Sequence, residues 1–104
     1  MEMTERVIYK HVFSPRVSPG GESIIMAPEA QVLSVGTQRN RMVLWFKTTP
    51  QDHAWAQNRN CQRYFFILGT GVSYMEKDEP KGMRYVGTAQ VGELVWHLHE
   101  EIKP

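Results

Sequence analysis

Residues 31–48, QVLSVGTQRNRMVLWFKT, have the pattern of a β-hairpin. β-Branched and aromatic side chains, which favour strands, recur along two runs, Gln31–Gln38 and Arg41–Thr48. The pair Arg39-Asn40 separates the runs, and Asn40 is the residue there that best tolerates the positive φ angle of a tight turn. The stretch therefore predicts two antiparallel strands joined by a turn near Asn40.

The chain on both sides of this hairpin also has the character of short strands. From residue 6 to residue 13, one set of side chains alternates with another at the period of a half-buried strand: Val7, Tyr9, His11 and Phe13 alternate with Arg6, Ile8 and Lys10. Residues 49–60 are polar, contain a proline and show no clean period, so we expect a loop with at most one helical turn. With no convincing helix, the chain is expected to be all-β: a small antiparallel sandwich or partly open barrel of about six to seven strands. Further strands are predicted at residues 22–27, 61–68, 83–91 and 93–102.

Length and composition limit the class of protein. The 104 residues correspond to one domain, 1–104, because domains most often hold roughly 100–150 residues. With 12 Lys+Arg against 11 Asp+Glu, the net charge of +1 gives no overall attraction to nucleic acid or to an anionic membrane. No apolar run is long enough to span a membrane, and Cys61, the only cysteine, has no partner for an internal disulfide. We therefore expect a protein of a reducing compartment.

A set of arginine, aromatic, histidine and glycine residues in the C-terminal half has the chemistry of a nucleotide site. Guanidinium groups bind phosphates through paired hydrogen bonds, and flat rings stack on bases. The glycine-rich segment at residues 69–71 offers backbone N–H groups to an anion, although a turn that ends a strand is the simpler interpretation. For any single residue, the simpler interpretation is a ring in the core or an arginine in solvent. The candidate ligand-binding residues are Arg63, Tyr64, Gly69, Thr70, Gly71, Arg84, Tyr85, Trp96 and His97.

His97 and His99 are weak candidates for a metal site. Residues i and i+2 of a strand share a face and lie about 6.6–6.8 Å apart, so both imidazoles would point the same way. A zinc site needs a further ligand, and His11 is the best candidate if the first and last strands pair. The simpler interpretation is a solvated outer face, and we expect no metal and no cofactor. The buried residues of the opposite face would be Leu94, Trp96 and Leu98.

Several motifs resemble a family of short, uncharacterised proteins of tailed bacteriophages. The C-terminal motifs are FILGTG at 66–71, MRYVGTAQ at 83–90 and LVWH at 94–97; the N-terminal ones are RVIYK at 6–10, MAP at 26–28 and VLSV at 32–35. The resemblance spans nearly the whole chain, but the loops at 14–21 and 49–60 are longer than in the family. It implies a small phage accessory protein made in the host cytoplasm, and it brings no assigned activity.

The leading functional hypothesis is a non-enzymatic phage counter-defence protein. Such accessory proteins often antagonise host defence, and the candidate residues suit a nucleotide-derived immune signalling molecule, which the protein would bind and sequester. A chain this short makes a poor deep pocket, so we expect a homo-oligomer whose interface encloses the ligand. One alternative is an inhibitor of a host defence enzyme that acts through the 49–60 loop with Trp55 and Arg59. Another is a minor virion or assembly component; an enzyme would need the His97/His99 metal site.

Overall fold

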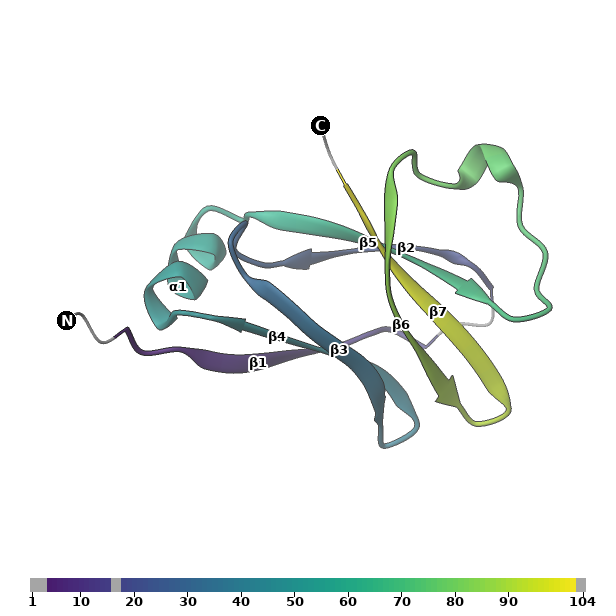
Figure 1. The fold of residues 1–104 in the computed structure, drawn as a ribbon, viewed down its shortest axis with the longest axis horizontal. Coiled ribbons are helices and arrows are strands. Elements are labelled where there is room, and N and C mark those ends of the chain that lie inside the picture. The colour runs from purple at the N-terminus through teal and green to yellow at the C-terminus, as the bar shows by residue number, and fades with distance from the viewer. Residues whose placement is uncertain (1–3, 16–17, 103–104) are drawn as a thin grey trace.

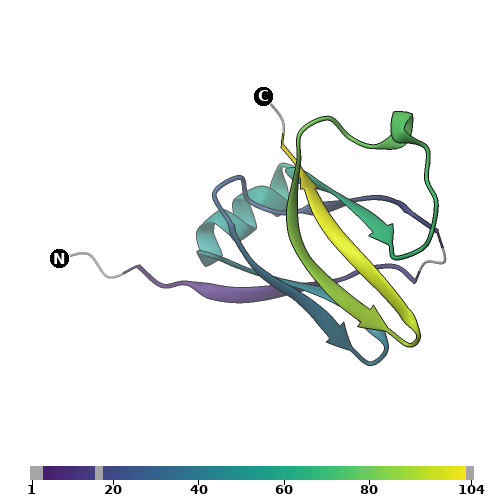
Figure 2. The same ribbon diagram turned by 45° about the vertical axis from the view of Figure 1, so that its right-hand side comes forward.

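The computed structural model describes residues 4–15 and 18–102 and contains seven strands in two antiparallel sheets (Figures 1 and 2). Sheet A consists, in spatial order, of β1 (Val7–Val12), β4 (Arg41–Thr48) and β3 (Gln31–Gln38). Sheet B consists, in the same way, of β2 (Gly20–Ile25), β5 (Gln62–Gly69), β7 (Leu94–Glu101) and β6 (Met83–Val91). The predicted all-β fold is confirmed as a small sandwich, and it is not a closed barrel.

The predicted β3–β4 hairpin is present with the predicted bounds. Its register pairs Gln38 with Arg41, which leaves a two-residue turn. In that turn Arg39 has a φ of 50° and Asn40 a φ of 60°. Positive φ at both central residues is the geometry of a type I′ turn, whose twist matches that of the two strands.

One apolar cluster fills the space between the sheets. Every second residue of the central strands points into it, as the period of two predicts. The prediction for β7 is wrong at one position: Leu94 is 43% exposed because it lies at the tip of the β6–β7 hairpin, whereas Glu100 at the far end is buried. The inward residues of the central strands include Met42, Leu44 and Phe46 from β4, Phe65 and Ile67 from β5, and Trp96 and Leu98 from β7.

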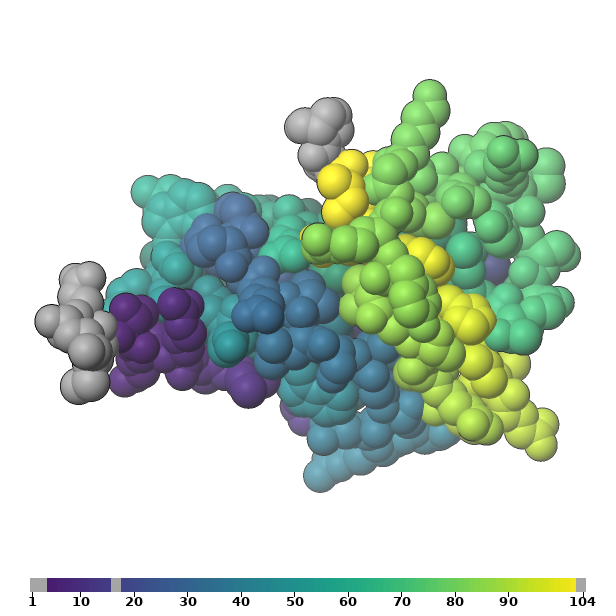
Figure 3. All heavy atoms as spheres, viewed as in Figure 1, coloured from purple at the N-terminus to yellow at the C-terminus, as the bar shows by residue number. Residues whose placement is uncertain are grey.

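The sheets approach each other most closely along β3 and β6, which lie side by side in all three views (Figures 1, 2 and 3). We call this contact the seam. Gly87 allows it, because a Cβ atom there would lie 2.5 Å from Cγ1 of Val35. Thr37 Oγ1 donates a hydrogen bond of 2.6 Å across the seam to the carbonyl of Gln90. A β-bulge between Tyr85 and Gly87 breaks the β6–β7 register next to this contact.

The prediction of a loop at residues 49–60 is wrong, because the segment contains the helix α1 (Pro50–Asn58). Thr49 caps the helix by accepting a hydrogen bond from the backbone N–H of Asp52, and Pro50 occupies the first turn, where its missing N–H is harmless. The sequence of the helix has almost no amphipathic period, and Ala56 is its one fully buried residue. Among the described residues, no helix is long and apolar enough to cross a membrane.

Candidate functional site

Arg63 lies at the inner face of sheet B, and each of its three guanidinium nitrogens donates a hydrogen bond. Its Nε and Nη2 atoms donate to the two carboxylate oxygens of Glu100 at 2.6 and 2.9 Å. Its Nη1 atom donates to the carbonyls of Ala30 and Ala27 at 2.7 and 3.3 Å. The side chain is only 15% exposed. Arg63 therefore ties β5 to β7 and to the turn before β3, and its guanidinium has little capacity left for a ligand.

Glu100 is the buried acid at the centre of this cluster. Burial by itself would raise its pKa, but the hydrogen bonds and charge of Arg63, followed by those of Arg84, outweigh burial and hold the pKa below its ordinary value. Arg84 on β6 donates from Nη2 to Oε1 of Glu100 at 3.0 Å. The carboxylate is thus ionised and shared between two guanidinium groups of very different exposure.

Arg84 is the arginine that remains available to a ligand. Its side chain is 61% exposed, and Glu100 occupies one N–H donor only. The next residue, Tyr85, pairs with His99 on the outer face of sheet B, and its ring is 58% exposed at the β-bulge. Arg84 and Tyr85 both border an open hollow of about 340 Å³ at the end of the seam, which we call the seam hollow. Its lining consists of Ala30, Gln31, Val32, Leu33, Arg63, Arg84, Tyr85 and Val86.

His97 lies on the opposite, outer face of sheet B in a row of hydroxyl groups. Its Nε2 lies 2.6 Å from Oγ1 of Thr70, and its Nδ1 lies 2.9 Å from Oγ1 of Thr88. The Tyr85 hydroxyl is hydrogen-bonded to the same Thr88 oxygen. The structure therefore brings three candidate residues, Thr70, Tyr85 and His97, into one network. Both nitrogens of His97 already have partners there, so the network fixes the ring.

The other candidate residues serve the packing of sheet B. The Trp96 ring lies in the core against Gly69, where a Cβ atom would be 2.7 Å from the ring. The Tyr64 ring covers Gly21 of the neighbouring strand, and a Cβ atom at Gly21 would overlap its hydroxyl group. Gly71 has a φ of 74° and terminates β5 in a turn, as the simpler interpretation predicts. The candidate set is therefore divided between the two faces of sheet B and does not form one site.

The condition for a metal site that includes His11 is not met. The first and last strands lie in different sheets, and Nε2 of His11 is 2.7 Å from a carboxylate oxygen of Glu22 on β2. His99 packs edge-on against the Tyr85 ring, with ring centroids 5.5 Å apart. Within residues 4–15 and 18–102, no group of three or more His, Cys, Asp or Glu side chains is placed to hold a metal ion.

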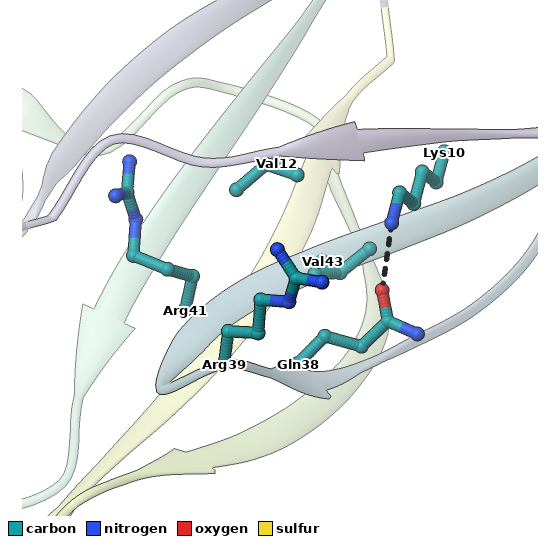
Figure 4. Close-up of a pocket in the computed structure, with 6 residues that line it drawn as sticks. All are labelled: Lys10, Val12, Gln38, Arg39, Arg41 and Val43. Atoms are coloured by element: carbon teal, nitrogen blue, oxygen red, sulfur yellow. Dashed lines mark hydrogen bonds between the residues drawn. The ribbon is translucent and has the colours of Figure 1, made fainter.

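A second hollow, of about 650 Å³, lies on the outer face of sheet A (Figure 4). Three basic side chains surround it: Lys10 from β1, Arg41 from β4 and Arg39 from the turn. Figure 4 shows Val12 and Val43 between them and the hydrogen bond of 3.0 Å from Lys10 Nζ to Gln38 Oε1. We call this the basic hollow.

The comparison with protein families matches a family model over residues 4–104, which is almost the entire chain. The chain belongs to the DUF7352 family. Its description, a domain of unknown function, assigns no activity to the DUF7352 domain. No curated protein and no solved structure matches the chain. The chemistry of this DUF7352 domain must therefore be argued from its own residues.

The helix of the DUF7352 domain presents one aromatic side chain to solvent. Trp55 is 42% exposed, and the guanidinium carbon of Arg59 lies 4.8 Å from the centre of its ring. This distance is that of a cation–π contact. The pair was predicted on a loop, whereas Trp55 lies on helix α1 and Arg59 directly follows it.

The basic hollow is the feature of the DUF7352 domain that the sequence analysis missed. The net charge of +1 does not reveal the basic hollow, because acidic residues elsewhere in the chain offset its basic residues. The signal that could have revealed it is local. The strands of sheet A and the β3–β4 turn contain four Lys or Arg residues and no Asp or Glu residue. The period of two then places Lys10, Arg41 and Lys47 on the outer face.

Proposed function

We propose that this protein binds and sequesters a nucleotide-derived signalling molecule at the seam hollow, without chemical conversion. The observation that carries the proposal is the exposed guanidinium of Arg84 at the seam hollow, whose lining also includes Tyr85. A guanidinium binds phosphate with directed hydrogen bonds. Arg84 thus offers the donors that the phosphate of a nucleotide needs.

The buried cluster behind Arg84 supports this role. Glu100 fixes one side of the guanidinium, and Arg63 in turn fixes Glu100 with two hydrogen bonds. Because the carboxylate is already neutralised by Arg63, the charge of Arg84 is left for a phosphate. A side chain that is held in position before binding loses less conformational entropy when the ligand arrives.

The size of the seam hollow favours an assembly of copies. Its volume of about 340 Å³ is at the lower end of the range for small-molecule sites, roughly 300–1,000 Å³, and the hollow is open to solvent. One nucleotide unit fills such a space, and a second copy of the chain would cover the part of a larger ligand that projects. The proposal therefore includes a homo-oligomer.

The biological setting is part of the proposal. The motifs at residues 66–71, 83–90 and 94–97 resemble proteins of tailed bacteriophages. We infer that the protein is made in the host cytoplasm during infection and that removal of a nucleotide signal counters host defence.

Isothermal titration calorimetry with cyclic di-AMP, cyclic di-GMP and ADP-ribose tests the binding proposal. At least one probe should bind, and Arg84→Gln should weaken that binding about 10–150-fold, the value of one hydrogen bond to a charged group. Arg59→Gln, the same change at the residue that follows helix α1, is the matched control and should leave the affinity unchanged. Binding of no probe, or equal affinities for the two variants, would refute the assignment.

The alternative function, inhibition of a host defence enzyme, is supported by the exposed Trp55–Arg59 pair. Tryptophan and arginine are the residues most enriched where binding energy concentrates at protein interfaces. Deletion of residues 49–60 would remove buried Ala56 and damage the core, so a point substitution is the better test. Under this alternative, Trp55→Ala abolishes capture of the partner enzyme, whereas Arg84→Gln has no effect on it.

A further inference from the structure

The charges of this protein are distributed unevenly between its two sheets. Four of the 12 Lys and Arg residues lie in sheet A and its β3–β4 turn, which contain no acid. The remaining eight basic residues are outnumbered by all 11 acids. The near-neutral chain thus combines one basic sheet with a net acidic remainder. The net charge of +1 does not reveal this uneven distribution.

Within residues 4–15 and 18–102, the basic side chains of sheet A form no ion pair with an acid. Lys10 donates to the amide oxygen of Gln38 and Arg41 to the carbonyl of Phe13, at 3.0 and 3.4 Å. In the part of the chain that the structure describes, no ion pair links either of them, or Arg39, to a carboxylate. Three like charges around one hollow repel each other in the absence of an anion, and they attract a polyanion.

The aromatic ring of Trp45 lies between the three charges around the basic hollow and the fourth charge of sheet A, Lys47. Along the outer face of β4, the residues alternate as Arg41, Val43, Trp45 and Lys47, and Trp45 pairs across the sheet with Lys10. The half-buried Trp45 ring packs against Gly36 of β3, where a Cβ atom would lie 2.8 Å from the ring. From Arg41 to Lys47 the stripe is about 20 Å long at the rise of a β-strand.

We propose that the outer face of sheet A binds single-stranded nucleic acid. The basic side chains would contact successive phosphates, and an unpaired base would stack near Trp45. A positive groove that follows the backbone, with aromatic rings for the bases, is the usual arrangement in proteins that bind single strands without sequence preference. A duplex keeps its bases paired and stacked, and a vesicle of anionic lipid has no base for the tryptophan to contact. The inference does not depend on the seam hollow, which lies at the contact of β3 with β6.

Fluorescence anisotropy with a labelled oligothymidine of about 12 nucleotides tests the inference. If three to four phosphates are contacted, the affinity should fall about 20–50-fold between about 50 and 200 mM salt. The double variant R39Q/R41Q should weaken binding at least tenfold and flatten the salt dependence. The matched control K77Q/K81Q removes two charges from the loop before β6, and its affinity should equal that of the wild type.

A substitution at Trp45 distinguishes the contribution of base stacking to the affinity from the contribution of charge. Trp45→Leu keeps an apolar side chain over Gly36 but removes the aromatic surface, so affinity should fall roughly 5–150-fold with an unchanged salt dependence. Circular dichroism of each variant verifies the fold. No binding at low salt, equal loss in the two double variants, or no effect of Trp45→Leu would overturn the proposal. Preference for a matched duplex or for phosphatidylserine vesicles would overturn it as well. Arg84→Gln should leave oligothymidine binding intact, so the two proposals fail independently.

Discussion

The Glu100 cluster yields a sharp prediction, because the next residue, Glu101, provides a matched control on the opposite face of β7. Glu100→Gln keeps the shape of the side chain and one acceptor oxygen, but it leaves the Arg63 guanidinium, 15% exposed, without its counter-charge. Breaking one partner of a buried ion pair costs about 3–5 kcal/mol, and the retained amide places this change at the lower end, about 3 kcal/mol. The corresponding change at Glu101, which is partly exposed, should cost less than about 0.5 kcal/mol.

Urea denaturation followed by tryptophan fluorescence measures both values. With a dependence of about 1–3 kcal/mol per molar urea, Glu100→Gln should lower the midpoint by about 1–3 M, while Glu101→Gln leaves it nearly unchanged. The double variant Arg63→Gln/Glu100→Gln should lose less than the sum of its single changes, since no unpaired charge remains. Equal midpoints for Glu100→Gln and Glu101→Gln would refute the reasoning that Arg63 and Glu100 form a structural pair.

Three further predictions concern the pH dependence at Glu100, the seam and the cap of α1. The pKa of Glu100 is lower in the folded state than its ordinary value. The ionised carboxylate therefore stabilises the fold fully above the ordinary value, and this stabilisation is lost as the pH falls through the folded-state pKa. As the pH is lowered, the free energy of unfolding should fall less for Glu100→Gln than for the wild type. Gly87→Ala should cost about 1–3 kcal/mol by pushing β6 from Val35, and Val35→Ala in the same chain should restore part of that loss in thermal melts. Thr49→Ala removes the cap of α1 and should cost about 1 kcal/mol in the same melts, whereas no change would mean that the hydroxyl does not cap.

The strands of this protein could be predicted from sequence because each one carries its own signal. The β3–β4 hairpin has a two-residue turn with Asn40, and the bounds of both strands follow from the alternation on either side. The helix had no comparable signal, since only Ala56 is buried and the polar residues show no period. Its capping pattern, Thr49 before Pro50, was present in the sequence but was not used to predict a helix.

The candidate site was predicted less well, because residue chemistry does not say which face of a sheet a side chain occupies relative to its partners. Arg63 and Arg84 were selected as a phosphate-binding pair, and Glu100, the acid that joins them, was not considered. Trp96 and His97 were assigned to one candidate site, although adjacent residues of a strand point to opposite faces. The network of Thr70, Tyr85 and His97 depends on the pairing of β6 with β7; the two strands were predicted, but their pairing was not.

Native mass spectrometry of the protein mixed with cyclic di-AMP, cyclic di-GMP and ADP-ribose tests the central claim, sequestration of an unaltered nucleotide, most directly. The account predicts an assembly of two or more chains that retains the full, unchanged mass of one probe, and it predicts loss of that mass in Arg84→Gln. A protein that carries no added mass with any probe, or a probe whose mass changes on incubation with the protein, would contradict the claim.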